Sequence, residues 1–219
     1  MSFFARRGIA SADALRGAAV GISSPGSESD ALLGLVLQRL GLTRDDVTIA
    51  VCGVDAERMR RLREGTIAAT LLNEPCRSIL LADGYVPLVD PLAEHVPWVF
   101  TGLVVDRAYL ERERDAVLRF LTATLEGNHL ALGDPARAKR VLARELGRDD
   151  AIVDRAYDDF AALTPFDVAY SDEGERNVIA HVAAPGAPHD PSAYADPSLV
   201  AALHASGAVA ASARRYGVG

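Results

Sequence analysis

The chain has 219 residues and a formal net charge of −7 at pH 7, with 49% hydrophobic and 24% charged residues. This mix is typical of a soluble globular protein that buries a core, and the length suits one large domain or two small lobes. The acidic balance, without basic runs interleaved with aromatic residues, argues against nucleic acid as a partner.

The first half of the chain alternates short apolar runs with amphipathic stretches. Residues 18–23, AAVGIS, are typical of a buried strand, and residues 28–40 then place Leu and Val at helical spacing until Gly41. The predicted strands are 18–23, 47–52, 66–72 and 85–89, and the predicted helices are 28–40, 55–65 and 74–84. Asp55 is the predicted N-cap of the second helix, and Gly65 its predicted end. This alternation predicts a parallel sheet with helices on both faces.

The second half of the chain is mainly helical. Residues 98–106, WVFTGLVVD, form one more extended apolar run and predict a last strand. The predicted helices that follow are 107–132 (one or two helices), 134–147, 148–163 and 172–183. Asp134 is the predicted cap of the helix 134–147, and residues 184–197 predict a loop before one or two short helices. These helices either form a bundle of their own or cover a sheet whose other strands lie outside this sequence.

The loop SSPGS at 23–27 is longer than a tight turn requires. In an open parallel sheet, ligands bind beyond the carboxyl ends of the strands, and a helix N-terminus favours an anion. Gly26 allows close backbone approach, and Ser24, Ser27 and Ser29 offer hydroxyl donors. The loop therefore suits a carboxylate, sulfonate, phosphate or other oxyanion.

A purely structural interpretation of the same loop stays open. Ser27 and Asp30 match the Ser-x-x-Asp form of a capping box, which would satisfy the helix without any ligand. Glu28 and Asp30 complement the helix dipole, and their charges would repel a free anion.

A second candidate loop lies in LLNEPCRS at 71–78, again between a predicted strand and a predicted helix. Asn73 and Glu74 could face the same cleft, where a carboxylate would favour an amino or other cationic group of a ligand. The alternative is that Asn73 caps the helix and Glu74 lies in its first turn.

Motifs for catalysis or metal binding are absent from the sequence. No pair among the 5 histidines has the spacing of metal ligands on a helix face, and no nucleophile elbow, P-loop or dinucleotide fingerprint occurs. Cys52 and Cys76 lack Cys-x-x-Cys spacing, and they are either two separate buried thiols or a disulfide. We therefore expect no metal, no cofactor and no catalytic residue.

Several segments, taken in order, resemble one known family. LRGAAVGISSPGSESDALLGLVLQRLGL is similar to the segment that opens the second lobe in solute-binding proteins of the nitrate/sulfonate/taurine ABC importer family. VDAERMRRLREGTIAATLLNEPCRSILLADGY resembles the segment that follows in that family, and VVDRAYLERERDAVLRFLTATLEG resembles the return to the first lobe. DEGERNVIA and DPSLVAAL resemble its closing helices, so the resemblance covers nearly the whole chain.

The resemblance implies a periplasmic-binding-protein fold of type II. It implies one parallel α/β lobe at 16–105, which binds the ligand, followed by a mainly helical part at 106–219 that belongs to the other, incomplete lobe. Family members begin with roughly a further half lobe, which this chain lacks. Residue by residue, Gly26, Ser27 and Ser29 match the anion-contacting loop, and Asn73 and Glu74 match the second cleft loop.

The implied function is transport rather than chemistry. The chain would be the substrate-binding component, whole or truncated, of an ABC importer, and would present a small anionic or zwitterionic solute to a permease. The alternative is an enzyme on the same fold, similar to an aromatic decarboxylase or a thiamine-pyrimidine synthase, although the His/Cys-rich motifs of the synthases are absent. The incomplete lobe implies self-association.

The family implies an extracytoplasmic or membrane-tethered location. The N-terminal segment MSFFARRGIASADALRG, however, has no apolar region after its arginines, and no stretch of the chain is long enough to span a membrane. The sequence as written therefore predicts a cytoplasmic location.

Overall fold

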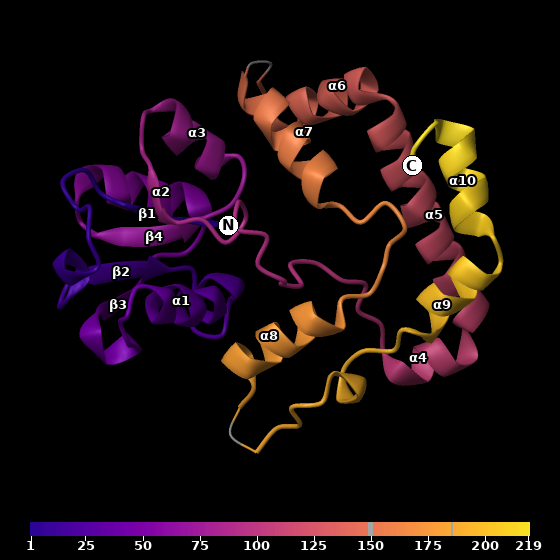
Figure 1. The fold of residues 1–219 in the computed structure, drawn as a ribbon, viewed down its shortest axis with the longest axis horizontal. Coiled ribbons are helices and arrows are strands. Elements are labelled where there is room, and N and C mark those ends of the chain that lie inside the picture. The colour runs from indigo at the N-terminus through magenta and orange to yellow at the C-terminus, as the bar shows by residue number, and fades with distance from the viewer. Residues whose placement is uncertain (149–150, 185) are drawn as a thin grey trace. The chain divides into compact units, whose positions relative to one another are not determined.

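The computed structural model describes residues 1–148, 151–184 and 186–219. These residues form two compact units. Unit 1 comprises Met1–Phe100 and Glu173–Pro191, and unit 2 comprises Thr101–Asp172 and Ser192–Gly219. Unit 1 contains the sheet, and unit 2 is built from helices (Figure 1). Residues 149–150 of the predicted helix 148–163 and residue 185 of the predicted loop 184–197 lie outside the described residues.

The sheet of unit 1 has five strands in the order β3-β2-β4-β1-β5. Its strands are β1 (Ser2–Ala5), β2 (Ala19–Ile22), β3 (Thr48–Val51), β4 (Ala69–Leu72) and β5 (Pro87–Val89). β2 pairs in parallel with both β3 and β4. Strands therefore form at all four runs predicted between residues 18 and 89.

The sheet is not purely parallel, because it also contains β1, a strand that was not predicted. β1 lies between β4 and β5 and pairs antiparallel with both. The four predicted strands still run in one direction, but β5 reaches the others only through β1. All four residues of β1 are buried, and Phe3 and Phe4 pack into different clusters of the core. A four-residue run buried on both faces has no alternation of polar and apolar residues to reveal it.

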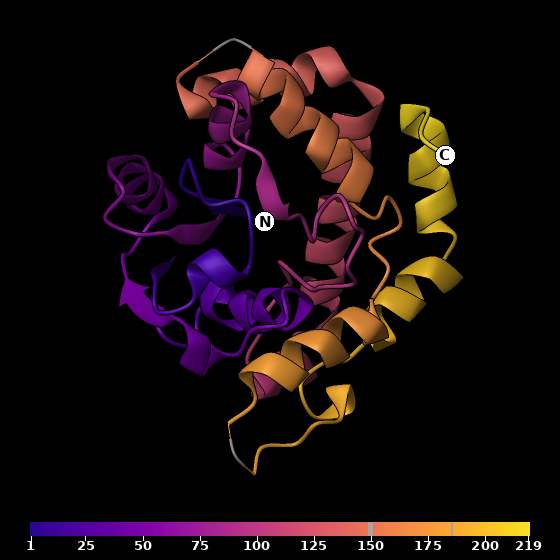
Figure 2. The same ribbon diagram turned by 60° about the vertical axis from the view of Figure 1, so that its left-hand side comes forward.

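Helices cover both faces of this sheet, as predicted. Unit 1 contains η1 (Asp13–Leu15), α1 (Glu28–Arg39), η2 (Arg44–Asp46), α2 (Asp55–Glu64), α3 (Cys76–Ala82) and most of α8 (Asp172–Val182). α1 contributes Leu33 and Leu37 to one core cluster, and α2 and α3 contribute Leu62 and Leu80 to the other. Figures 1 and 2 show α1 on the opposite side of the sheet from α2 and α3.

All regular elements in the described residues of unit 2 are helices. Its elements are α4 (Arg107–Arg112), α5 (Arg114–Gly133), α6 (Pro135–Leu146), α7 (Ala151–Leu163), α9 (Ser198–Ala205) and α10 (Ala208–Tyr216), and η3 (Pro191–Ala193) precedes α9 across the unit boundary. Asp134 caps α6 by accepting from the Arg137 amide, as predicted. The buried His129 of α5 contacts Ser212 Oγ of α10 at 2.8 Å and donates to the Phe166 carbonyl at 2.6 Å.

The predicted strand at 98–106 is wrong. These residues are described and have no regular secondary structure, and the Val104 side chain is 90% exposed. An apolar run forms a strand only where another strand can pair with it, and the described residues contain no strand that pairs with 98–106. None of the helices in the described part of the chain has both the length and the apolar character needed to cross a membrane.

Candidate functional site

The first candidate loop, residues 23–27, leads from β2 into α1. Its tip, at Ser24 and Gly26, is exposed, and Gly26 has a φ of 74°, a left-handed conformation that favours glycine. The Gly26 amide donates to Asp30 Oδ2 at 2.8 Å. This predicted ligand donor is therefore already paired inside the loop.

Ser27 and Ser29 are also paired within the loop. Ser27 is the N-cap of α1, and its hydroxyl accepts from the Asp30 amide at 3.3 Å. Ser29 is 1% exposed, its Oγ accepts from the Ser23 amide at 2.9 Å, and the Ser27 hydroxyl lies 3.1 Å from it. These contacts agree with the capping interpretation of Ser27, and they use the hydroxyl of Ser29 inside the loop. In the capping box itself, Asp30 bonds the Gly26 amide rather than the amide of the N-cap residue.

Three donors of this loop have no acceptor among the described residues: the Ser24 hydroxyl and the backbone amides of Glu28 and Ser29. The two amides belong to the first turn of α1, where the helix dipole adds positive potential. The neighbouring Asp30 carboxylate is paired with Arg44, which reduces its repulsion of an anion. The loop thus keeps backbone donors for an oxyanion after its own side chains have paired.

The second candidate loop, residues 73–75, leads from β4 into α3. Glu74 is directed to its own helix, since Oε2 accepts from the Ser78 amide at 3.3 Å and Oε1 lies 3.3 Å from Arg77 Nη1. The Asn73 side chain makes no capping hydrogen bond to α3, whose N-cap residue is Pro75. The helix contact predicted for Asn73 is thus made by Glu74.

Asn73 instead joins the two loops. Its side-chain Nδ2 donates to Glu28 Oε2 at 3.5 Å. Glu28 Oε1 is buried and has no hydrogen-bond partner among the described residues. Burial raises the pKa of Glu28 above its ordinary value, and the charge of the N-terminal amino group and the hydrogen bond from Asn73 oppose this shift. The structure therefore brings Asn73 to the first loop and leaves Glu74 out of that contact.

Two residues that position this region were not recognised as site residues. Arg58 of α2 is 1% exposed, forms an ion pair with Asp55, and donates to the carbonyl oxygens of Gly53 and Leu71. Asp55 Oδ2 in turn accepts from the Asn73 amide at 2.7 Å. The pair thus ties the loop after β3 to the end of β4 and holds the backbone of Asn73.

Asp55 was predicted as the N-cap of α2, and this is wrong. Val54 occupies the N-cap position, and Asp55 is the first residue of the helix. Its carboxylate bonds Arg58 and the second loop because both lie within reach beyond the strand ends. The Asp-x-x-Arg spacing, which places both side chains on one helix face, was the signal available in the sequence.

A second polar cluster lies at the end of β5. Arg77 donates to Ser2 Oγ at 2.7 Å and lies 3.3 Å from Asp90 Oδ2, and Ser2 donates to Asp90 Oδ1 at 2.7 Å. These contacts join α3 to β1 and β5. They balance the charge of Arg77 against Asp90 and Glu74, so this cation is not a spare anion ligand.

The structure bears on two further expectations, the state of the cysteines and the presence of a metal site. Cys52 and Cys76 are both free and buried, which confirms the interpretation as separate thiols, and burial raises the pKa of Cys76. Within the described ranges, no group of three His, Cys, Asp or Glu side chains could hold a metal ion.

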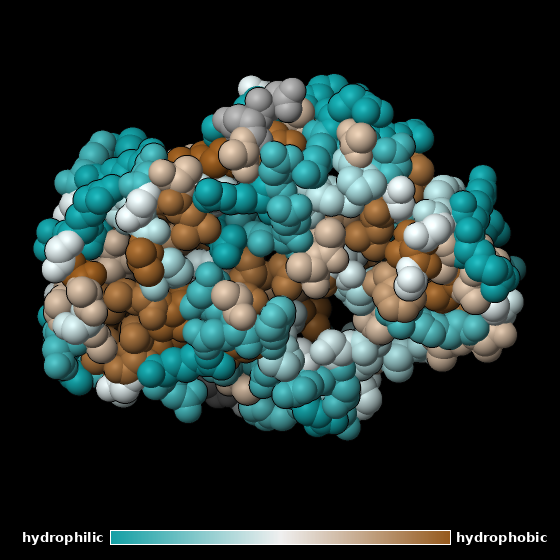
Figure 3. Space-filling model, turned by 45° about the horizontal axis from the view of Figure 1, so that its top comes forward, coloured by the Kyte–Doolittle hydropathy of each residue, from teal (hydrophilic) through white to brown (hydrophobic). Residues whose placement is uncertain are grey.

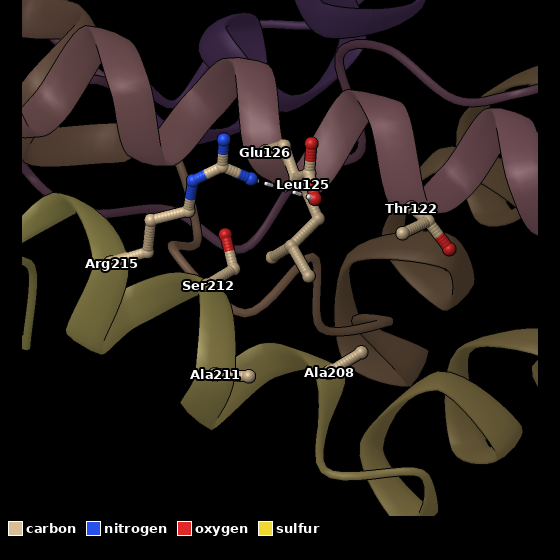
Figure 4. Close-up of a pocket in the computed structure, with 7 residues that line it drawn as sticks. All are labelled: Thr122, Leu125, Glu126, Ala208, Ala211, Ser212 and Arg215. Atoms are coloured by element: carbon tan, nitrogen blue, oxygen red, sulfur yellow. Dashed lines mark ion pairs between the residues drawn. The ribbon is translucent and has the colours of Figure 1, made fainter.

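Two pockets lie in unit 2, whereas the predicted loops belong to unit 1. One, of about 200 Å³, separates Thr122, Leu125 and Glu126 of α5 from α10 (Figure 4). Glu126 and Arg215 form an ion pair of 3.8 Å across it. The other lies between α5, α6 and α7. Neither contains a residue that the sequence predicted to bind ligand.

Residues 1–138 match the protein-family model described as NMT1/THI5 like. No curated protein matches the chain. Among solved structures, the chain is similar to the periplasmic aliphatic sulphonate binding protein SsuA of Escherichia coli, with a TM-score of 0.60 and 20% identity. That match covers 72% of this chain and 51% of the SsuA chain, so the chain spans about half the length of that protein.

Two further structures extend the comparison. The sulfonate ABC transporter's periplasmic binding protein SsuA from Methylobacillus flagellatus KT has a TM-score of 0.69 and 20% identity, and the match covers 94% of this chain and 66% of that one. The desulfurization enzyme DSZB has a TM-score of 0.59 and 18% identity, with 94% of this chain and 76% of that one covered. The chain therefore has the fold of periplasmic binding proteins, a fold that also carries an enzyme.

Proposed function

Since the chain belongs to the NMT1/THI5-like family, we propose that it is a solute-binding component of an ABC importer. Its ligand is a small anionic or zwitterionic solute of the sulfonate, nitrate or taurine type. The candidate residues in unit 1 are Ser24, Gly26, Ser27 and Ser29 in the first loop and Asn73 and Glu74 in the second. The protein performs no chemistry on the solute. It acts outside the cytoplasm, where it delivers the solute to a permease in the membrane.

The unpaired amides of Glu28 and Ser29 are the observation that carries this proposal. Two adjacent amides at the start of a 12-residue helix suit one oxyanion group of a solute. The hydroxyls of Ser27 and Ser29 then hold the shape of the loop and do not contact the solute, because their hydrogen bonds are made within the loop.

The Glu28 carboxylate favours a zwitterion over a bare anion. It lies between the two loops with an unpaired oxygen, whereas the charge of Asp55 is already balanced by Arg58. An ammonium group of the solute would add to the partial compensation of Glu28 by the N-terminal amino group, and nitrate would not. In this role Glu28 replaces Glu74, whose carboxylate is directed to α3.

Isothermal titration calorimetry tests the proposal with three probes: taurine, ethanesulfonate and nitrate. We expect saturable binding, tightest for taurine, and an unchanged solute in the NMR spectrum after incubation. Absence of saturable heat with all three probes would contradict the proposal.

An enzyme on the same fold is the second candidate, and the similarity to DSZB favours it. Conversion of a sulfonate or sulfinate probe during the same incubation would support the enzyme and overturn the binder. Binding without conversion supports the binder.

Self-association is part of the proposal, since unit 2 exposes large apolar side chains. Apolar residues reach the surface as brown areas in Figure 3, and Val104, Phe120 and Tyr109 are 90%, 57% and 43% exposed. Light scattering behind a sizing column should give a mass that rises above 23.2 kDa with concentration. If both the wild type and Phe120→Ser keep the mass of a monomer at every concentration, self-association is contradicted.

A further inference from the structure

The pocket between α5, α6 and α7 has a volume of about 240 Å³ and lies wholly within unit 2. It shares no residue with the loops of unit 1 that carry the proposed function. Its apolar wall combines one residue of α5 with two of α6 and two of α7: Leu130, Val141, Leu142, Tyr157 and Phe160.

Aromatic rings form one side of this pocket. The Tyr157 and Phe160 rings lie 6.1 Å apart between centroids at an angle of 49°. The Tyr157 hydroxyl donates to the Ala131 carbonyl at 3.1 Å, which fixes the ring. Such a fixed pair offers faces and edges for a further aromatic ring.

The side of the pocket that α6 forms is only partly covered by the other helices. None of its residues from Pro135 to Leu146 is buried, although one face of the helix is apolar, and Val141 is 44% exposed. The apolar face of α6 is therefore only partly covered by α5 and α7.

The charges around the pocket favour an anion. Lys139 lies over the Tyr157 ring at 5.2 Å from the centroid, but its charge is balanced by Asp154 at 2.8 Å. Arg137 lines the pocket and is exposed, and its guanidinium has no hydrogen bond or ion pair among the described residues. The Asp134 carboxylate accepts from the backbone amide of Arg137 rather than from this guanidinium.

We propose that this pocket binds a small organic anion with an aromatic body, such as an aryl sulfonate or aryl carboxylate. The rings pack against Tyr157, Phe160 and Val141, and the anionic group pairs with Arg137. A dry cavity of about 150 Å³ holds one benzene ring, so the observed volume admits one or two rings. This binding site is separate from the solute site and does not depend on it.

The test uses a matched pair of fluorescent two-ring probes, naphthalene-1-sulfonate and its uncharged counterpart naphthalene-1-sulfonamide. In the full chain, Arg137→Gln should weaken the binding of the sulfonate about two- to fivefold, as expected for one exposed charge pair, and leave the neutral probe unchanged. Val141→Asp should weaken the sulfonate by more than tenfold, because it adds a negative charge inside the pocket.

Two matched variants locate the site. Arg119→Gln removes an exposed arginine of α5 outside this pocket, and Arg215→Gln removes the arginine of the other pocket; both should leave the affinities unchanged. Far-UV circular dichroism confirms that each variant is folded.

The proposal is overturned if Arg137→Gln affects both probes equally or neither, or if Arg215→Gln has the larger effect. It is also overturned if light scattering shows a dimer that Val141→Asp dissociates, since a second copy would then be the occupant of this face. Loss of taurine binding in unit 1 has no bearing on any of these outcomes.

Discussion

The Asn73 side-chain amide donates to Glu28 Oε2 at 3.5 Å, and this contact joins the loop after β2 to the loop after β4. Both loops lie at the carboxyl ends of parallel strands, where open α/β sheets bind ligands. The contact leaves Glu28 Oε1 buried without a partner in the described part of the chain. A buried carboxylate with one unpaired oxygen lowers stability unless it becomes protonated or gains a donor.

The first prediction is a pH dependence that Glu28 controls. Its pKa in the folded protein is raised by burial above the ordinary 4.5, so the folded state binds the proton more tightly than the unfolded state. The free energy of unfolding should therefore rise as pH falls from 7 towards 4.5, and this gain should be absent in Glu28→Gln. Urea unfolding followed by the single tryptophan, Trp98 of unit 1, measures it.

Titration of Glu57 does not affect the stability between pH 7 and about 4.5. Its hydrogen bonds with Arg60 and Arg61 lower its pKa to about 2, so its stabilising contribution is lost only as pH falls below about 4.5. Equal pH slopes for the wild type and Glu28→Gln would contradict the assignment.

The second prediction separates the two interpretations of Ser27. Ser27→Ala should lower the stability of unit 1 by about 1 kcal/mol through loss of the α1 cap. Because the hydroxyl is already used inside the loop, taurine affinity measured by calorimetry should change little. Ser24→Ala, whose hydroxyl is exposed, is the control and should leave stability unchanged. A large loss of affinity with unchanged stability would make Ser27 a direct ligand contact.

The third prediction concerns the buried Arg58. Arg58→Met removes the ion pair with Asp55 and leaves the buried Leu71 carbonyl without this donor, which should cost about 1–3 kcal/mol. The exposed Arg60→Met on the same helix is the control, and its surface ion pairs contribute little. Trp98 fluorescence during urea unfolding compares them, and equal midpoints would contradict the positioning role of Arg58.

The fourth prediction tests the packing of unit 2. A Cβ at Gly133 would lie 2.1 Å from the Tyr216 carbonyl oxygen, so Gly133→Ala must displace the end of α10 and should cost about 1–3 kcal/mol. Gly127→Ala is the matched control on α5, where nothing lies within 4 Å of the new Cβ. It should stabilise the helix by about 0.5–1 kcal/mol. Circular dichroism at 222 nm during heating measures the melting temperatures of both variants. If both melting temperatures shift in the same direction from the wild type, this packing is contradicted.

Local sequence signals were sufficient for most elements. Gly65 ends α2 with a φ of 76°, and Gly147 ends α6 with a φ of 64°, which are the predicted ends of these helices. Leu33 and Leu37 pack on the sheet as the helical spacing of 28–40 predicted. These signals act within a few residues, which is why the sequence contains them.

The failures concern features that depend on distant partners. β1 exists because β4 and β5 flank it, and the run at 98–106 has no strand beside it in the described residues. The same dependence on distant partners applies to the proposed site. Both of its loops follow predicted strands, but the hydrogen bonds of Asn73 with Asp55 and with Glu28 join residues that meet only after folding.

A titration of ¹⁵N-labelled protein with taurine, followed by two-dimensional amide NMR, tests whether the first turn of α1 binds the solute. The amide resonances of Glu28 and Ser29 should shift saturably with one dissociation constant, shared by the Asn73 side-chain amide, while those of α10 stay in place. Saturable shifts confined to other residues, with Glu28 and Ser29 unmoved at full occupancy, would contradict it.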